Sequence, residues 1–321
     1  MAVVLFSAPY MIPFLDRFKP FFERLEIKLI IPDVKERLGE QELLALAGEF
    51  DGVICGDDRF TSTVIEACTP RLKVISKWGT GIDSIDQEAC RKHGIMIGNT
   101  PDAFTKPVSD TVLGYILAFA RQLPWMDRAV KRGIWKKIPG RSLSETTLGV
   151  VGVGKIGQAV LRRAKAFEMN LLGTDIRIID SKITREIGVQ MVSFEELLSK
   201  ADFISLNCDL NPTSRGLINE DAFKKMKSEA VLINTSRGPV VDQEALIQAL
   251  AAKKIGGAGL DVYQEEPLPP ESPLLQFDNV LLAPHNANSS PTAWERVHEN
   301  TIKNLLVGLE MIGPEQEVNF E

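Results

Sequence analysis

A glycine-rich segment in the middle of the chain has the residue types and spacing of a phosphate-binding loop. Gly152, Gly154 and Gly157 follow an apolar run at 148–151. Glycines in such a turn let the backbone approach a pyrophosphate, whose charge then lies at a helix N-terminus. Asp175 comes 18 positions after Gly157 (175 − 157), where this kind of fold places the acid that hydrogen-bonds the adenine ribose. That carboxylate would repel a 2′-phosphate, so the pattern predicts NAD rather than NADP.

Two alternatives stay open at this loop. A glycine turn can also occur without a ligand, in which case Asp175 would only cap the segment that follows it. Arg177 could accept a 2′-phosphate. Because Asp175 is expected to lie closer to the ribose than Arg177, we expect its effect to outweigh that of Arg177 and NAD to remain the preferred cofactor.

Polar residues capable of catalysis stand just after two later apolar runs. A guanidinium at Arg237 can hold a carboxylate and the adjacent 2-oxo oxygen through paired donors. An imidazole at His285 can give and take a proton near neutral pH, at the edge where open α/β sheets bind ligands. Either residue alone could be structural. Glu265 and Glu266 are both candidates for a carboxylate that orients the ring and stabilises its protonated form, and periodicity does not choose between them.

The elements that must position these residues follow from alternation along the chain. Short apolar runs alternate with polar segments of helical length, which is typical of parallel α/β layers. An amphipathic helix is expected at 108–122, after Pro107 and before Pro124, as a link between two series of runs. Another helix is expected at 291–308. The expected strands are 3–6, 28–31, 52–55, 73–76 and 95–98, then 148–151, 171–174, 203–207, 231–234, 257–262 and 280–283.

Composition narrows the function classes. With 321 residues, 44% of them hydrophobic, the chain is long enough for two domains. The net charge of −6, with no concentrated basic face, makes nucleic acid an improbable partner. Four cysteines without C-x-x-C spacing and only three histidines predict no metal site. The longest apolar run, 112–120, is too short to span a membrane, so no membrane association and a cytoplasmic location are expected.

Several segments in order resemble the D-isomer-specific 2-hydroxyacid dehydrogenases over nearly the whole chain. The resemblance implies an NAD-dependent oxidoreductase that acts on CH–OH groups and interconverts a small D-2-hydroxy acid and its 2-oxo acid. The segments are the glycine loop, Lys77-Trp78-Gly79-Thr80-Gly81-Ile82-Asp83, Asn99-Thr100-Pro101, 233–242, 259–268 and Pro284-His285.

The resemblance also implies the architecture. A Rossmann NAD-binding domain at 101–289 is expected to be inserted into a smaller, flavodoxin-like α/β substrate domain made of 1–100 and 290–321. Members of the family usually dimerise through the cofactor domain, so a homodimer is expected.

The site residues implied by the resemblance extend the chemistry above. Arg237 binds substrate, His285 is the acid and base, and Glu266 rather than Glu265 is its partner. Asp261 would hydrogen-bond the nicotinamide carboxamide. The expected cofactor contacts are Thr80, Val108, Gly152, Gly154, Lys155, Ile156, Gly157, Asp175, Cys208, Thr235, Ser236, Arg237, Asp261, His285 and Asn288, and the expected substrate contacts are Lys77, Gly79, Thr80, Gly81, Arg237 and His285.

Three segments depart from the common family pattern. Asn207-Cys208-Asp209 stands where many members have His-x-Pro, Asn286-Ala287-Asn288 makes the region after the histidine more polar, and Lys77 replaces a frequent arginine. None of them removes a catalytic group.

The substrate loop resembles that of phosphoglycerate dehydrogenases, so 3-phosphoglycerate and 3-phosphohydroxypyruvate are the first expectation. Glyoxylate or hydroxypyruvate is the alternative. Two further alternatives are a non-enzymatic NAD sensor resembling transcriptional corepressors, and a formate or phosphonate dehydrogenase.

Overall fold

The computed structural model describes residues 1–320, which form two compact units. Unit 1 comprises residues 1–104 and 290–320 of the described chain, and unit 2 comprises residues 105–289. Among the described residues, no helix has both the length and the apolar character that a bilayer crossing requires.

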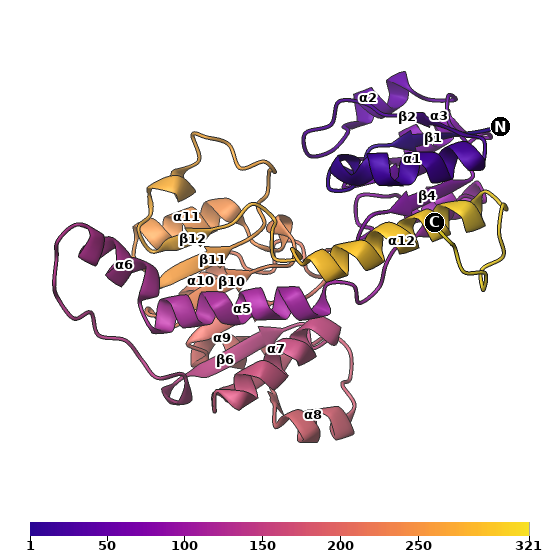
Figure 1. Ribbon diagram of the computed structural model, residues 1–321. Helices are drawn as coiled ribbons and strands as arrows, with labels where there is room; N and C mark the ends of the chain where they lie inside the picture. Colours follow the sequence, from indigo (N-terminus) through magenta and orange to yellow (C-terminus); the bar gives the residue numbers. More distant parts are fainter. Residues whose placement is uncertain (321) are drawn as a thin grey trace. The chain divides into compact units, whose positions relative to one another are not determined.

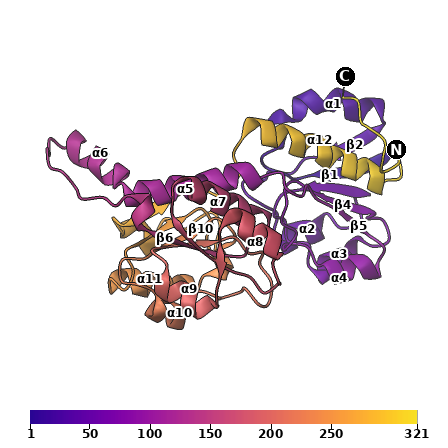
Figure 2. The same cartoon turned by 90° about the horizontal axis from the view of Figure 1, so that it is seen from below.

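Unit 1 is built on a five-stranded parallel sheet in the order β2-β1-β3-β4-β5, which is the flavodoxin-like order expected from the resemblance. The helices α1 and α12 cover one face, and α2, α3 and α4 lie on the other (Figure 2). The elements are β1 (Ala2–Phe6), α1 (Leu15–Arg24), β2 (Ile27–Ile30), α2 (Glu40–Ala45), β3 (Gly52–Cys55), α3 (Ser62–Cys68), β4 (Val74–Lys77), α4 (Gln87–Lys92), β5 (Met96–Gly98) and α12 (Pro291–Gly308).

The helix α12 completes unit 1 from the far end of the sequence. It packs along β3, β4 and β5 (Figure 1), and its inward face carries Val297, His298, Ile302, Leu305 and Leu306, all buried. Ser290 caps its first turn through a side-chain hydrogen bond to the Ala293 N–H. The predicted helix at 291–308 is confirmed.

Unit 2 contains a seven-stranded parallel sheet in the order β12-β11-β10-β9-β6-β7-β8. The chain reverses its direction of winding between β6 and β9, which is the switch point where Rossmann folds bind ligands. The strands are β6 (Thr147–Val151), β7 (Asn170–Thr174), β8 (Gln190–Met191), β9 (Phe203–Leu206), β10 (Val231–Asn234), β11 (Gly257–Leu260) and β12 (Val280–Leu282).

Helices cover both faces of this sheet, which explains why its strands are near-continuous apolar runs. The helices α5 and α7 lie side by side on one face (Figure 1), and α9, α10 and α11 belong to the other. The helices are α5 (Thr105–Ala120), α6 (Leu123–Lys131), α7 (Lys155–Ala166), α8 (Ser181–Ile187), α9 (Phe194–Lys200), α10 (Glu220–Lys225) and α11 (Gln243–Ala251).

The long helix α5 differs from its prediction at both ends. It begins at Thr105 rather than after Pro107, and it ends at Ala120. Proline is tolerated there because the N–H groups of a helix's first turn have no partner within the helix. The chain then turns at Gln122, whose φ of 56° is left-handed, before α6 begins.

Candidate active site

The glycine loop connects β6 to α7, at the switch point of the unit 2 sheet. Gly152 has a φ of 89°, and a Cβ there would lie 2.8 Å from the backbone of Asn207 and Cys208. A Cβ on Gly157 would lie 2.1 Å from the Gly152 carbonyl oxygen. Both positions therefore require glycine. Gly154 is the N-cap of α7, so the loop presents backbone N–H groups at a helix N-terminus, a favourable place for a phosphate.

Asp175 fixes this loop from the end of β7. Its Oδ2 accepts a hydrogen bond from the Val153 N–H at 2.8 Å, and both oxygens accept from the Arg177 guanidinium at 3.1 Å. Partial burial acts to raise the pKa of Asp175, but the hydrogen bonds from Arg177 and Val153 outweigh it and hold the pKa below its usual range. The carboxylate is therefore charged at neutral pH, as NAD selection requires.

Two polar atoms at the carboxyl ends of β9 and β10 also suit a bound cofactor. The Thr235 hydroxyl and the Asn207 side-chain oxygen are buried and have no hydrogen-bond partner among residues 1–320. Buried polar atoms are normally paired, so each is available to a ligand. Together with the glycine loop, these groups fit a dinucleotide.

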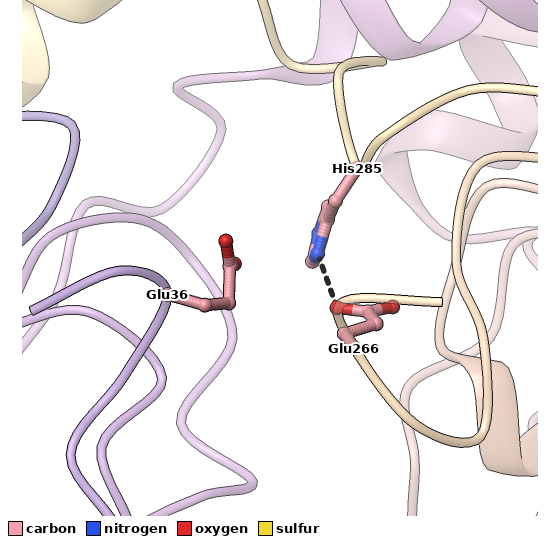
Figure 3. A group of neighbouring side chains, drawn as sticks. All are labelled: Glu36, Glu266 and His285. Carbon is pink, nitrogen blue, oxygen red and sulfur yellow. Dashed lines mark hydrogen bonds and ion pairs between the residues drawn. The ribbon is translucent and has the colours of Figure 1, made fainter. Parts of the chain in front are cut away.

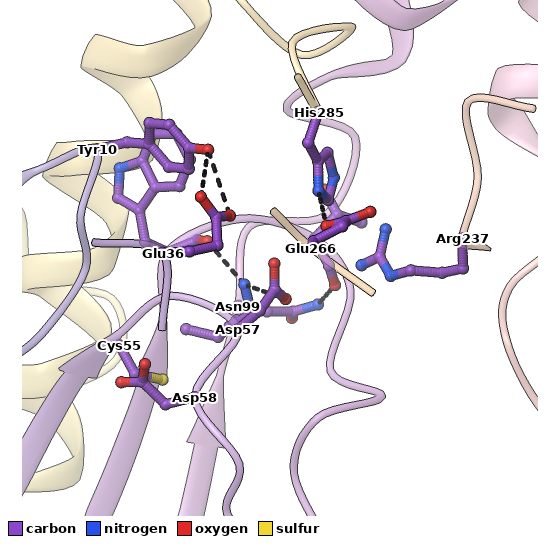
Figure 4. Close-up of polar contacts among 12 residues, drawn as sticks. Tyr10, Glu36, Cys55, Asp57, Asp58, Asn99, Arg237, Glu266 and His285 are labelled. Atoms are coloured by element: carbon purple, nitrogen blue, oxygen red, sulfur yellow. Dashed lines mark hydrogen bonds and ion pairs between the residues drawn. The ribbon is translucent and has the colours of Figure 1, made fainter. Parts of the chain in front are cut away.

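The turn after β10 presents Arg237. Asn234, almost fully buried, accepts from the Ser236 N–H at 3.1 Å and donates to the Arg237 carbonyl at 2.9 Å. Gly238 follows because a Cβ there would lie 1.8 Å from the Tyr263 carbonyl oxygen. The guanidinium of Arg237 points toward Glu266 and His285 (Figure 4). The local turn thus fixes the direction of a side chain with paired donors.

Glu266 and His285 form a hydrogen-bonded pair. The His285 Nδ1 lies 2.9 Å from Glu266 Oε2 (Figure 3), and Oε1 of the same carboxylate accepts from the Tyr263 N–H at 2.8 Å. A carboxylate only accepts, so Nδ1 carries the proton in the neutral ring, and Nε2 is the nitrogen through which the ring would exchange a proton with a substrate. The side chains of His285 and Glu266 are 20% and 16% exposed, so neither is fully buried.

Asp261 holds the loop that carries His285. Its two carboxylate oxygens accept from the Asn286 N–H at 2.7 Å and the Ala287 N–H at 2.9 Å. Burial raises the pKa of Asp261 more than these bonds lower it. His285 itself has a φ of 50°, a left-handed conformation uncommon for residues other than glycine. Asp261 therefore stabilises a strained turn, a role the sequence did not predict. Its predicted contact with nicotinamide stays a prediction.

The predicted substrate loop belongs to unit 1, directly after β4. Gly79 is buried with a φ of 122°, and its carbonyl accepts from the Thr100 N–H at 2.8 Å. Asn99 donates to the Thr80 carbonyl at 2.6 Å. The Nζ of Lys77 is buried, donates to the Trp78 carbonyl and pairs with Asp57 at 3.2 Å.

The structure thus brings Arg237, Glu266 and His285 together at the carboxyl edge of the unit 2 sheet. Asp261 holds the loop that carries His285. The glycine loop and Asp175 lie at the switch point of the same sheet. Gly79, Thr80, Gly81 and Lys77 are grouped in unit 1. The other predicted contacts lie in unit 2: Val108 buried in α5, Lys155 and Ile156 in the first turn of α7, Cys208 after β9, Ser236 after β10 and Asn288 after His285.

Comparisons with known proteins agree with this arrangement. Residues 113–287 match the model described as D-isomer specific 2-hydroxyacid dehydrogenase, NAD binding domain. A glyoxylate reductase of Korarchaeum cryptofilum is 41% identical over 255 residues, which are 78% of this chain and 76% of that protein. A D-3-phosphoglycerate dehydrogenase of Methanocaldococcus jannaschii is 40% identical over 265 residues, which are 81% of this chain but 50% of that protein, so the chain spans about half of its length. A D-lactate dehydrogenase of Aquifex aeolicus, solved with NAD and lactic acid, has a TM-score of 0.85 and 27% identity over 96% of both chains.

Proposed function

Because this chain belongs to the D-isomer-specific 2-hydroxyacid dehydrogenase family, we propose that it transfers hydride between NAD(H) and a small 2-oxo or D-2-hydroxy acid. The observation that carries the proposal is the pair formed by His285 and Glu266 at 2.9 Å, with the Arg237 guanidinium pointing toward it (Figure 4). An acid, its orienting carboxylate and a carboxylate-binding cation are the groups that reduction of a 2-oxo acid needs.

The cofactor, when bound, supplies or accepts the hydride. The glycine loop and α7 would hold its pyrophosphate, and Asp175 its adenine ribose. Arg237 binds the substrate carboxylate and the 2-oxo oxygen through its paired donors, and it stabilises the charge that develops on that oxygen. His285 then donates the Nε2 proton to the same oxygen, and Glu266 stabilises the protonated ring beforehand. In oxidation His285 takes the proton back.

Two observations point to different substrates within this class. The resemblance of the Lys77 loop favours 3-phosphohydroxypyruvate and 3-phosphoglycerate. The side chain of Lys77, however, is only 5% exposed and is already paired with Asp57, so it offers little to a phosphate dianion. This pairing favours glyoxylate or hydroxypyruvate, and relatives named glyoxylate reductases support the same alternative.

An NADH-oxidation screen tests the proposal. The panel contains glyoxylate, hydroxypyruvate, 3-phosphohydroxypyruvate and pyruvate, with formate and phosphite assayed by NAD reduction. Turnover of any 2-oxo acid supports the proposed class, and the ranking of kcat/KM separates the two substrate candidates. NADH binding without turnover of any compound would instead favour the NAD-sensor alternative. Turnover of formate or phosphite alone would favour a formate or phosphonate dehydrogenase.

A homodimer is part of the proposal. The segment from α6 to residue 135 exposes apolar side chains, with Trp135 92% exposed and Leu123, Val130 and Ile134 each about half exposed. Exposed apolar side chains gathered on one segment commonly mark an interface. Light scattering coupled to gel filtration should give twice the chain mass, and Trp135→Glu should shift the protein toward the monomer.

A further inference from the structure

The substrate loop of unit 1 is connected to α12 through a buried histidine. The indole Nε1 of Trp78, the residue before Gly79, donates to His298 Nδ1 at 2.9 Å. Trp78 is 3% exposed and His298 is fully buried. The two residues are 220 positions apart, so this bond joins the loop to the return helix directly.

A second set of bonds joins α12 to the neighbouring segment after β5. Asn300 donates to the Thr100 hydroxyl at 2.9 Å and to the Asn99 carbonyl at 3.1 Å. Asn304 donates to the same carbonyl at 3.0 Å. Residues 99 and 100 are therefore fixed by the helix.

The two connected segments also hold each other. The Thr100 N–H donates to the Gly79 carbonyl at 2.8 Å, the Thr80 hydroxyl donates to the Thr100 carbonyl at 2.9 Å, and Asn99 donates to the Thr80 carbonyl. The loop at 78–81 is thus held on one side by His298 and on the other by residues 99 and 100.

The choice of histidine at position 298 is not explained by packing. Its ring lies among Phe14, Phe18 and Trp78, and its Nε2 is buried with no partner among the described residues. An apolar side chain would fill this place and would carry no unpaired Nε2, but it would leave the buried indole N–H of Trp78 without an acceptor. Burial lowers the pKa of His298 to about 4, so at neutral pH the ring is uncharged and its Nδ1 can accept the indole N–H.

We propose that His298 is a positioning residue for substrate binding, which fixes the backbone at Gly79 and Thr80 through the indole of Trp78. The proposal rests on the proposed function and on the substrate contacts that the resemblance implies at Gly79, Thr80 and Gly81, whose backbone N–H groups would hold the substrate carboxylate together with Arg237. Its ligand is the carboxylate of a 2-oxo acid, and backbone N–H groups must point at that carboxylate to bind it. A loop released from Trp78 samples other conformations and binds the same carboxylate more weakly.

Two substitutions at position 298 separate positioning from packing. His298→Leu nearly preserves the volume but removes the acceptor, whereas His298→Asn loses volume but places Oδ1 close to where Nδ1 lies. We expect His298→Leu to raise KM for glyoxylate about 10- to 100-fold, with the Kd of NADH unchanged. His298→Asn should recover most of the wild-type KM, although its core is less well filled.

Amide hydrogen exchange at residues 78–81 and 99–100 provides a readout that needs no substrate. It should be faster in His298→Leu than in wild type and close to wild type in His298→Asn. If His298→Leu does not fold, Trp78→Phe removes the donor instead and should have the same effects. Leu305→Ala is the matched control, because Leu305 is buried on the same helix and is expected to lose stability without changing KM or loop exchange.

A wild-type KM and wild-type loop exchange in folded His298→Leu would overturn the proposal. The proposal would also be overturned if KM and loop exchange followed core filling alone, with a higher KM and faster exchange in His298→Asn than in His298→Leu. If the wild type reduces neither glyoxylate nor any other 2-oxo acid of the panel, the proposed function fails, and unchanged exchange in His298→Leu would then overturn the positioning role separately.

Discussion

The two units hold their functional loops by different means. In unit 2 the turns that carry Arg237 and Glu266 are held by residues close to them in sequence: Asn234 holds the turn before Arg237, and the Tyr263 N–H holds Glu266 three residues later. The loop that carries His285 is held by Asp261, from the same unit. In unit 1 the loop at 78–81 is held by α12 through the bond between Trp78 and His298, which are 220 positions apart. Contacts between residues close in sequence can be recognised in the sequence as a motif with fixed spacing. Contacts between distant residues appear in the sequence only as a single histidine or asparagine in a helix, with no pattern around it.

The largest effect should come from the unit with local contacts. His285→Ala removes the proton donor, and general acid catalysis contributes about 100- to 10,000-fold, so kcat for reduction should fall by that order. The Kd of NADH, measured by fluorescence titration, should stay close to wild type. A full-speed His285→Ala enzyme would show that the proton comes from elsewhere.

Arg237→Lys keeps the charge but loses the planar pair of donors. Losing one charge-assisted hydrogen bond is expected to lower kcat/KM for the 2-oxo acid about 10- to 100-fold. Steady-state kinetics at saturating NADH measure it, and Arg162→Lys, at an exposed arginine of the same unit that pairs with Glu186, is the control for a general effect of the replacement. Equal kcat/KM in Arg237→Lys and wild type would remove the role assigned to Arg237.

Glu266→Gln keeps the shape of the partner of His285 but removes its charge. A carboxylate close to a histidine favours the protonated ring. Removing the charge of Glu266 should therefore move the alkaline limb of the pH profile for reduction to lower pH, by about one to three pH units. Glu265→Gln, the neighbouring acid, should leave the limb in place. A shift in Glu265→Gln and none in Glu266→Gln would reverse the assignment.

Asp175→Asn tests how the cofactor loop is held. The amide oxygen can still accept from the Val153 N–H, but the charge is lost and Arg177 is released from its ion pair. The preference for NADH over NADPH, compared as kcat/KM, should narrow about tenfold. Adding Arg177→Gln should restore part of the preference, because the released guanidinium can no longer bind the 2′-phosphate. An unchanged preference would show that other residues select NAD.

The smallest effect concerns stability in acid, and it probes the distant contacts of unit 1. The pKa of His298 is lowered by burial to about 4, whereas a histidine in the unfolded chain titrates near ~6.5. Between these values only the unfolded chain takes up the proton, so stability is lost as the pH falls from about 6.5 to about 4. Asp58 has the opposite sign in this window, because burial raises its pKa to about 6.

Comparing wild type with His298→Asn isolates the histidine, since Asp58 is present in both. The free energy of unfolding, measured by urea titration, should fall by about 2 kcal/mol more in wild type than in His298→Asn between pH 7 and pH 4.5. Parallel curves for the two proteins would mean that His298 titrates normally in the folded chain.

Much of the fold could be predicted because fully covered parallel strands are continuous apolar runs. Their predicted positions agree with the observed strands to within a residue or two at most ends. β8 was missed because Gln190–Met191 is only two residues long and lies at the sheet edge. The start of α5 was misplaced because Pro107 reads as a boundary, whereas a first helical turn accepts it.

The candidate catalytic residues could be predicted because they belong to motifs with fixed spacing. Asn234, the loop-holding role of Asp261 and the connection between Trp78 and His298 could not. An aspartate after a strand can face a ligand or its own neighbouring backbone, and the sequence does not distinguish the two. The sequence around His298 shows only a histidine on an apolar helix face, and it does not indicate which strand end this histidine contacts.

The way unit 1 is divided along the chain sets an order for its assembly during synthesis. All five strands of its sheet are complete by residue 98, yet α12 follows unit 2, which is continuous from 105 to 289. Domains generally fold as units while the chain emerges, the N-terminal one first. In this chain the sheet of unit 1 is not complete with its covering helix until α12 has been made, nearly 200 residues later. Unit 2 can therefore finish folding before unit 1 does. The bond between Trp78 and His298 can form only after unit 2 has been synthesised, so the substrate loop is held in place only once the whole of unit 2 has been made.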